Sequence, residues 1–187
     1  MFADFPLSPQ QLQALEAHLE LLLRWNQKLN LTAIRNREEA IQRHYVESLF
    51  LGMHLPPGPL CIADVGSGAG FPGFPVAVLR PDCQVTLIEA HQRKAVFLRE
   101  SSRQQGNIRV LAERAELVDE TFDVAISRAV SYGDLVPILK KLAPRADLLT
   151  GVEEPPAEVG FTWLPPIALP SAKQRFLRIG SVSRGTE

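Results

Sequence analysis

A glycine-rich turn between an apolar run and a helical pattern constrains the fold of this chain more than any other feature. The turn, Asp64-Val65-Gly66-Ser67-Gly68-Ala69-Gly70, follows the apolar run 60–65. Glycines in such a turn adopt positive φ and let the backbone come close to a ligand. Exposed N–H groups at the start of the next helix can then bind a carboxylate or a phosphate. The turn therefore predicts a ligand-binding loop after the first strand of an α/β sheet.

Apolar runs and amphipathic stretches alternate along the rest of the chain. We expect strands at 60–65, 84–88, 108–111, 122–127, 146–150 and 175–182, and helices at 72–79, 91–105 and 134–142. Strands that alternate with helices form right-handed crossovers and a mostly parallel sheet covered on both faces. The pattern predicts a doubly wound, Rossmann-like α/β fold.

The first 59 residues follow a helical pattern instead. Ser8-Pro9 is typical of a helix start, leucines recur at helical spacing to about Leu29, and a second helical stretch runs from about 38 to 53. The proline-rich segment 55–59 cannot continue a helix. We therefore expect a helical extension, 1–59, and an α/β domain with a short C-terminal tail, 60–187.

Composition narrows the class of protein. The 20 basic and 21 acidic residues give a net charge of -1, so any contact with nucleic acid must be local. Cys61 and Cys83 have no Cys/His cluster near them, which predicts two buried thiols and neither a zinc site nor a disulfide. Asp4 stands where a secretion signal would be basic, and no apolar run reaches the roughly 18 residues of a membrane span. We expect a cytoplasmic protein without a metal.

The acidic residues around the turn favour one cofactor. Glu89 ends the second expected strand, where a carboxylate can accept both hydroxyls of a ribose. Phe71 stands where a dinucleotide loop has its third glycine, which disfavours NAD. Asp64 before the first glycine resembles the first motif of class I methyltransferases, whose cofactor S-adenosylmethionine is cationic near its sulfonium. We expect Asp64, Gly66, Gly68, Gly70 and Glu89 to bind it; the alternative for both carboxylates is a solvated surface.

Further stretches match one family in order along the chain: Asn30-Leu31-Thr32, Arg43-His44, Glu47-Ser48, the loop with its Phe71-Pro72-Gly73 ending, Glu89, Arg93-Lys94, 113–116 and Ser127-Arg128-Ala129. Over about residues 20–142 the chain resembles the RsmG (GidB) family. That resemblance implies methyl transfer from S-adenosylmethionine to N7 of a guanine in 16S ribosomal RNA. It also places cofactor contacts on Gly66, Phe71, Ala115, Glu116 and Arg128.

This chemistry asks little of the protein, because guanine N7 already holds a free lone pair and needs no general base. We therefore expect no catalytic acid or base, and local basic and polar groups that meet the RNA: Asn30, Arg43, His44, Arg93, Lys94 and Arg128, with Arg24 and Lys28 nearby. The alternatives are a solvated face for each arginine, a helix cap for Asn30, a structural hydrogen bond for His44 and core packing for Phe71.

The C-terminal part departs from the family pattern. Thr150 stands before Gly151 where the family commonly has lysine, and Ile179-Gly180 stands where the family's final strand usually ends near another lysine. Little room separates Gly151 from Phe161. We expect a monomer that acts on 16S ribosomal RNA or the small ribosomal subunit. The alternatives are a methyltransferase with a small-molecule or protein substrate, a noncatalytic ribosome-binding relative and, least favoured, a nicotinamide oxidoreductase.

Overall fold

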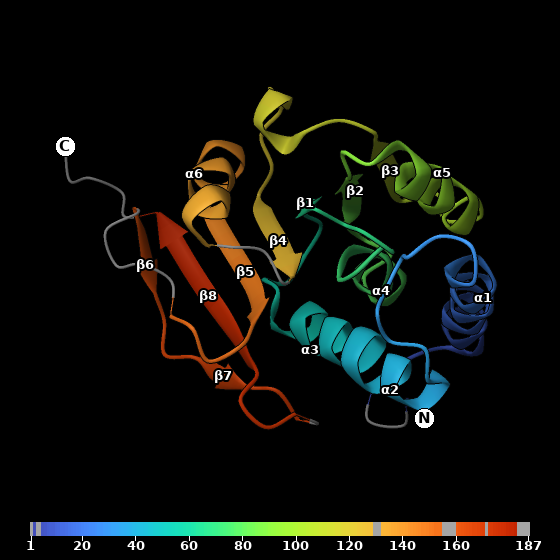
Figure 1. The fold of residues 1–187 in the computed structure, drawn as a ribbon. Coiled ribbons are helices and arrows are strands. Elements are labelled where there is room, and N and C mark those ends of the chain that lie inside the picture. The colour runs from blue at the N-terminus through green and yellow to red at the C-terminus, as the bar shows by residue number, and fades with distance from the viewer. Residues whose placement is uncertain (1, 3–4, 129–131, 155–159, 171, 183–187) are drawn as a thin grey trace.

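The computed structural model describes residues 2, 5–128, 132–154, 160–170 and 172–182. A central sheet lies between two layers of helices (Figure 1). Its strands are β1 (Cys61–Val65), β2 (Gln84–Ile88), β3 (Ile108–Leu111), β4 (Val124–Arg128), β5 (Arg145–Thr150), β6 (Phe161–Trp163), β7 (Ile167–Ala168) and β8 (Phe176–Val182). The described residues thus form an eight-stranded sheet.

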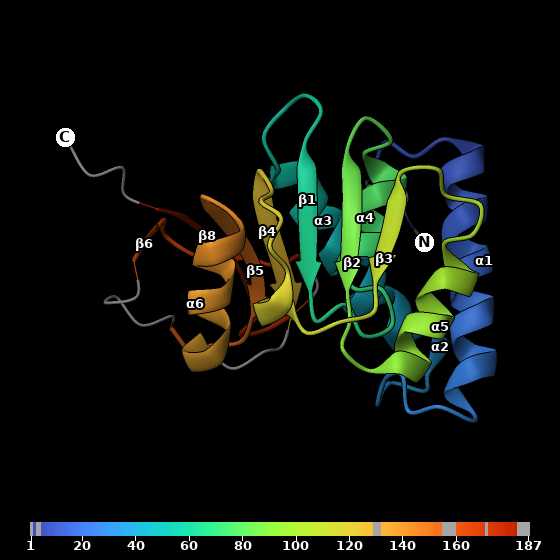
Figure 2. The same cartoon turned by 90° about the horizontal axis from the view of Figure 1, so that it is seen from above.

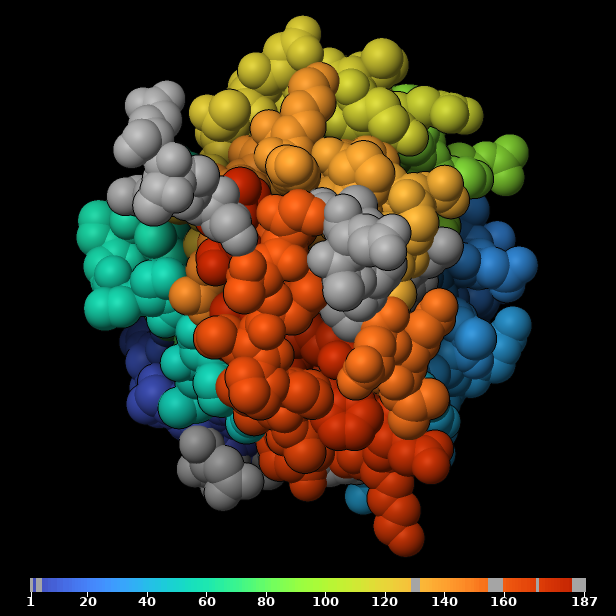
Figure 3. Space-filling model, turned by 90° about the vertical axis from the view of Figure 1, so that its left-hand side faces the viewer, coloured from blue at the N-terminus to red at the C-terminus, as the bar shows by residue number. Residues whose placement is uncertain are grey.

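The strand order is β3-β2-β1-β4-β5-β8-β6, with β7 also paired to β8. The first five strands are parallel, whereas β8 runs antiparallel to β5, β6 and β7. The predicted doubly wound, mostly parallel sheet is confirmed. The short strands β6 and β7 were not expected, because prolines interrupt the segment that holds them. Figure 3 shows this C-terminal part forming one end of the molecule.

Three crossover helices cover the parallel strands: α4 (Gly73–Leu79), α5 (Gln92–Ser101) and α6 (Tyr132–Leu142). Figure 2 shows α6 in front of the strands and α4 behind them. Between β3 and β4 the chain forms only the 3-10 turn η2 (Ala115–Leu117). Because β1 pairs with β2 and β4 so that Val65 lies beside Ile88 and Ser127, the loops after these strands emerge at one edge.

The N-terminal extension consists of α1 (Pro9–Asn26), α2 (Arg37–Ala40), the π-helical turn η1 (Ile41–Val46) and α3 (Glu47–His54). Ser8 caps α1: its hydroxyl accepts from Gln11 N, and the Gln11 side chain accepts from Ser8 N. The expected helix at 38–53 is therefore present, but a π-helical turn interrupts it at the residues that carry Arg43 and His44. Such turns occur frequently at functional sites.

One hydrophobic core joins the extension to the sheet. Buried leucines of α1 pack on α4 and α5, and α3 packs on α4 and β5. A second core lies on the other face, under α6. The boundary at residue 59 stays a prediction, since both segments share a core. No helix in the described part of the chain is long and apolar enough to span a membrane.

The prediction of two buried thiols is half wrong. Cys83 is buried, but Cys61 is exposed because it is the first residue of β1, at the amino end of the sheet.

Candidate cofactor and RNA site

The glycine loop connects β1 to α4 with backbone bonds to the neighbouring strand. Gly66 N and Ser67 N both donate to the carbonyl of Ile88, at 2.9 and 3.1 Å. Gly66, Gly68 and Gly70 have φ of 72°, 58° and 92°, so all three need glycine for conformation. A Cβ at Gly68 would meet only Gly66 O at 3.9 Å, whereas a Cβ at Gly70 would lie 3.2 Å from His18. Gly68 thus faces open space, and Gly70 faces the core.

Asp64 lies beneath this loop. Its side chain is fully buried, and Oδ2 accepts from Gly73 N at 2.9 Å at the start of α4. A Cβ at Gly73 would fall 2.6 Å from the same oxygen, so only glycine allows this contact. Burial raises the pKa of Asp64 to about 7, although the bond from Gly73 opposes the shift. Asp64 therefore connects the glycine loop to the start of α4 from the buried side of the loop. The alternative of a solvated carboxylate is wrong for this residue. Its direct contact with a cofactor stays a prediction.

Glu89 connects the loops that follow β1 and β2. Its two oxygens accept from Gly68 N at 2.8 Å and from His91 N at 2.7 Å. A carboxylate has about four lone-pair sites, so each oxygen can still accept a hydroxyl. The side chain borders a cavity of about 310 Å³ at the carboxyl edge of the sheet. Its position suits the predicted contact with a ribose.

That cavity lies where the predicted cofactor residues of three different loops meet. It is lined by Val65, Gly66, Ile88, Glu89, Ala90, Glu113, Arg114, Ala115, Glu116, Asp134, Leu135 and Ile138. Gly66, Glu89, Ala115 and Glu116 were predicted from the sequence. The α6 residues were not, because an apolar helix face does not reveal that it overhangs a cleft. The volume is at the lower end for small-molecule sites.

Next to the loop, two arginines, Arg128 and Arg175, lie against one buried carboxylate. Glu47 is completely buried, and both its oxygens accept from Arg175 at 2.8 Å. Arg128 lies 3.7 Å from the same carboxylate and also donates to the backbone carbonyl of Arg43. Burial lowers the pKa of Arg128 to about 10; Glu47 opposes this shift, and Arg175 and Arg43 add to it. Arg128 therefore remains charged at neutral pH, within a cluster that sequence reasoning had not connected to Glu47 or Arg175.

His44 holds Arg128 in place. Arg128 donates to His44 Nδ1 at 2.8 Å, so Nε2 carries the proton and donates to Thr32 Oγ1 at 2.8 Å. Burial, followed by the charge of Arg128, lowers the pKa of His44 to about 3 and keeps the ring neutral. The ring stacks on Phe71 at 4.6 Å. The structural alternative therefore describes His44, and Phe71, which is only 6% exposed, packs in the core.

The remaining predicted RNA residues lie on the surface. Asn30, Arg93 and Lys94 line one small pocket of about 240 Å³ beside His91. The capping alternative for Asn30 is wrong, because Asn26 accepts from the two backbone N–H groups that follow Asn30, and Asn36 caps α2. Arg43 is about half exposed and lies 3.4 Å from Glu39. Ala129, part of the motif at the end of β4, lies outside the described residues.

Comparison with known proteins identifies the family of this chain. Residues 11–147 match the GidB family model, described as rRNA small subunit methyltransferase G. Curated relatives of that name from Halorhodospira halophila and Chromobacterium violaceum are 44% and 42% identical. The alignments cover 76% and 67% of this chain and 70% and 61% of the relatives. The chain thus spans between three fifths and seven tenths of their length.

A solved S-adenosylmethionine-dependent methyltransferase from Aquifex aeolicus superposes with a TM-score of 0.60. It is 16% identical and covers 77% of this chain and 93% of its own, so this likeness concerns the fold. The class I methyltransferase fold predicted from the motifs is confirmed. The family model confirms the predicted methyltransferase class, which uses S-adenosylmethionine. Because the GidB family model matches most of the chain, the chain belongs to the rRNA small subunit methyltransferase G family.

Proposed function

We propose that this chain transfers a methyl group from S-adenosylmethionine to N7 of a guanine in 16S ribosomal RNA. The observation that carries the proposal is the cavity at the carboxyl edge, where the glycine loop and Glu89 meet in a chain of this family. Ligands bind in doubly wound sheets at this edge. The oxidoreductase alternative has no support here, because Phe71 packs in the core where a dinucleotide loop has glycine.

The residues around the cavity fit the cofactor. Glu89 offers acceptors to the ribose, Leu135 and Ile138 offer an apolar wall to the adenine, and the open side of Gly68 leaves room for the methionine part. When bound, S-adenosylmethionine supplies an electrophilic methyl group. Asp64 supports this arrangement indirectly, since it fastens the loop to α4.

The role of the protein in the reaction is alignment. Guanine N7 attacks the methyl carbon with its own lone pair, the bond from that carbon to sulfur breaks, and no proton moves. Correct alignment of two bound reactants can contribute about 7 to 11 kcal/mol. The predicted absence of a catalytic acid or base therefore stands as part of this proposal.

The arginine cluster suits the RNA side of the reaction. Arg128 and Arg175 bring two positive charges to one buried carboxylate, Glu47. Arg43, whose charge also acts on Arg128, pairs with Glu39 and remains about half exposed. A guanidinium fork matches a phosphate or the O6 edge of guanine. We assign Arg128 to the target nucleotide and His44 to holding Arg128, while Arg93 and Lys94 meet the RNA from the other side of the loop.

A noncatalytic ribosome-binding relative is the second candidate, because the family match ends at residue 147, just before Thr150. The structure shows a cation beside this threonine: Arg178 Nε donates to Thr150 Oγ1 at 3.3 Å from the neighbouring strand β8. Arg178 therefore brings a guanidinium to the position of the missing lysine, where it also lies 3.9 Å from Glu154, and this supports the active enzyme.

Methylation of 16S ribosomal RNA from cells that lack this protein tests the proposal. Purified protein and radiolabelled S-adenosylmethionine should label the RNA, and cleavage at 7-methylguanine should map a single site. Glu89→Ala should abolish most of the labelling. Binding of RNA without labelling would instead identify the noncatalytic relative, and labelling of a protein or small molecule would contradict the RNA substrate.

A further inference from the structure

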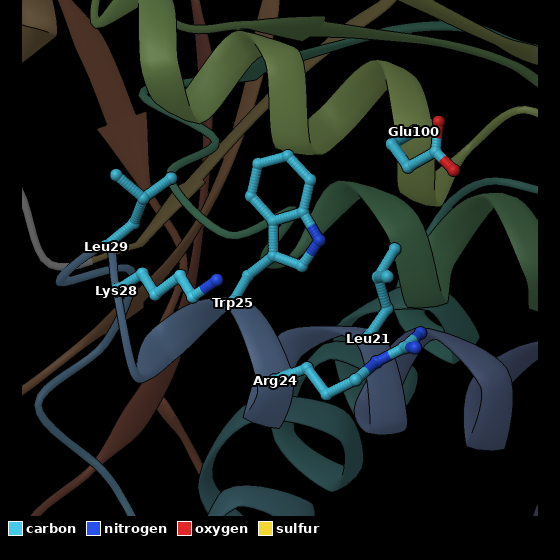
Figure 4. A pocket seen from close by; sticks show the side chains of 6 residues that line it. All are labelled: Leu21, Arg24, Trp25, Lys28, Leu29 and Glu100. Carbon is cyan, nitrogen blue, oxygen red and sulfur yellow. The ribbon is translucent and has the colours of Figure 1, made fainter.

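A second recess, outside the cofactor cavity, lies between α1 and α5. It has a volume of about 670 Å³ and is lined by Leu21, Arg24, Trp25, Lys28, Leu29 and Glu100. Figure 4 shows the indole ring of Trp25 standing between the two helices, with Leu21 and Leu29 on either side of it. The recess therefore has an aromatic and apolar floor with a charged rim.

The Trp25 ring has an aromatic partner on one side. It packs edge-to-face on Phe97 of α5 with 5.6 Å between ring centroids, yet the residue remains only partly buried. A ring held from one side and open on the other offers a flat surface to a second planar group. Every nucleic-acid base can stack on such a surface.

The rim continues into a band of unpaired cations. The small pocket beside His91 shares Lys28 and Leu29 with this recess and adds Arg93 and Lys94. Among the described residues, Arg24, Lys28, Arg93 and Lys94 form no ion pair. By contrast, Arg37 pairs with Glu20, and Arg109 with Glu120. In a chain of net charge -1, these four unneutralised cations favour a polyanionic partner.

We propose that this recess, with the band of Lys28, Arg93 and Lys94, binds an unpaired stretch of RNA next to the methylated guanine. One base stacks on Trp25, and the backbone phosphates lie along the three cations. This inference rests on the proposed function and extends it, because the band begins just after Glu89 and leads from the cofactor edge to Trp25. Glu100 lies at the opposite rim and repels phosphate, so the backbone passes on the Lys28 side.

A protein partner fits this surface less well. The cores of protein interfaces are depleted in lysine and in charge generally. Here charged side chains make up half of the lining, and two more cations follow directly. An aromatic floor flanked by cations is instead the usual composition of surfaces that bind single-stranded RNA.

Tryptophan fluorescence tests the proposed stacking directly. The chain has two tryptophans, so Trp163→Phe leaves Trp25 as the single reporter. Titration with protein-free 16S ribosomal RNA should quench its emission. Trp25→Leu should weaken RNA binding about tenfold or more, with Trp25→Phe in between, while S-adenosylmethionine affinity stays unchanged and confirms folding. Emission that does not change while the RNA binds would overturn the proposal.

The charges have their own test. Lys28→Gln should flatten the plot of log affinity against log salt by about 0.7, the contribution of one phosphate that is no longer neutralised. Glu100→Gln should tighten binding, and Arg109→Gln, which removes a paired surface charge on β3, is the matched control. A slope equal to that of the control overturns the proposal. So does weaker binding to intact small subunits with unchanged binding to bare RNA, since that result assigns the recess to a protein.

Methylation of the same RNA by the parent protein distinguishes a failure of the proposed RNA-binding recess from a failure of the proposed methyltransferase function. Labelled RNA without quenching overturns the recess alone. Quenching without any labelling supports the recess as an RNA site and contradicts the proposed function.

Discussion

The cofactor edge and the arginine cluster lie beside the same loop but are built in opposite ways. At the cofactor edge, backbone N–H groups of the loop make the hydrogen bonds that fix its shape: Gly66 and Ser67 donate to the Ile88 carbonyl, and Gly68 donates to the Glu89 carboxylate. In the arginine cluster, side chains make most of the hydrogen bonds and ion pairs. Glu47 and Arg175, for example, are joined by two hydrogen bonds although 128 positions separate them in the sequence.

This difference separates ligand binding from stability. Glu89 lies at the border of a cavity, where water or a ligand can take over its bonds. Glu47 has no exposed surface, so its partners have no substitute when it is removed. We therefore expect changes at the cofactor edge to alter affinity and changes in the arginine cluster to alter the free energy of unfolding.

The largest expected effect is that of Glu47→Ala. It leaves Arg175 and Arg128 without their shared carboxylate, and removal of one partner from a buried ion pair typically costs about 3 to 5 kcal/mol. Urea unfolding at neutral pH measures this loss. If the variant folds too poorly, Glu47→Gln, which keeps one acceptor for Arg175, should show a smaller loss in the same direction.

Glu39→Ala is the matched control for this change. Glu39 pairs with Arg43 at 3.4 Å on the surface, with both side chains about half exposed. Such a pair contributes about 0 to 1 kcal/mol. Equal losses for Glu39→Ala and Glu47→Ala would contradict the distinction between the buried and the exposed pair.

A second prediction concerns Glu89→Ala, which should weaken S-adenosylmethionine binding by about tenfold or more. Each charge-assisted hydrogen bond to the ribose contributes about 1.5 to 3 kcal/mol at most, and tenfold is about 1.4 kcal/mol. Calorimetric titration measures the affinity, and urea unfolding in parallel should show a much smaller loss than Glu47→Ala. Parent-like affinity in the folded variant would remove Glu89 from the cofactor site.

The same difference, between local backbone contacts and long-range side-chain contacts, explains which parts of each region could be predicted from the sequence. The loop, Glu89 and the strands β2 and β3 could be predicted because their signals are local: glycines at a turn, a carboxylate at a strand end and short apolar runs. Glu47 and Arg175 could not be connected, because only the finished fold brings α3 next to the chain before β8. The strands β6 and β7 were missed because they are short and lie among prolines.

For two residues, Asp64 and Asn30, the sequence motif does not predict where the side chain lies. Asp64 belongs to the loop motif, but the motif does not say on which side of the loop its carboxylate lies, and the structure places it beneath. Asn30 and Asn26 are equally suited to end a helix by residue type. The chain turns so that Asn26 accepts both backbone bonds, which leaves Asn30 on the surface with Arg93 and Lys94.

A third prediction separates the two kinds of glycine in the loop region. A Cβ at Gly73 would lie 2.3 Å from Leu87 and 2.6 Å from Asp64, so Gly73→Ala should destabilise the protein by about 1 to 3 kcal/mol. Gly68→Val has open space but unfavourable φ, and its side chain obstructs the cofactor. It should therefore reduce affinity more than stability. Parent-like cofactor affinity in folded Gly68→Val would place the methionine part elsewhere.

The smallest expected effect concerns His18, which connects the N-terminal extension to the loop. Its ring stacks on Phe74 at 4.0 Å, and Nδ1 lies 2.6 Å from the Tyr45 hydroxyl. Burial lowers the pKa of His18 from 6.5 to about 3. The unfolded chain therefore takes up a proton near pH 6.5 and the folded chain does not. The stability that His18 contributes is complete above that pH and decreases as the pH falls toward 3.

From about pH 7.5 to about pH 5.5, this difference amounts to about 1.4 kcal/mol for one histidine. His18→Phe should remove that part of the pH dependence, whatever its effect on absolute stability, and Tyr45→Phe, which keeps the histidine, should retain it. His44 contributes in the same direction and Asp64, whose pKa is raised to about 7, in the opposite one. The difference in slope between the two variants is therefore the decisive quantity in urea unfolding at both pH values. Equal slopes would mean that His18 takes up its proton in the folded protein, and that the extension packs on the loop less tightly than the ring contacts indicate.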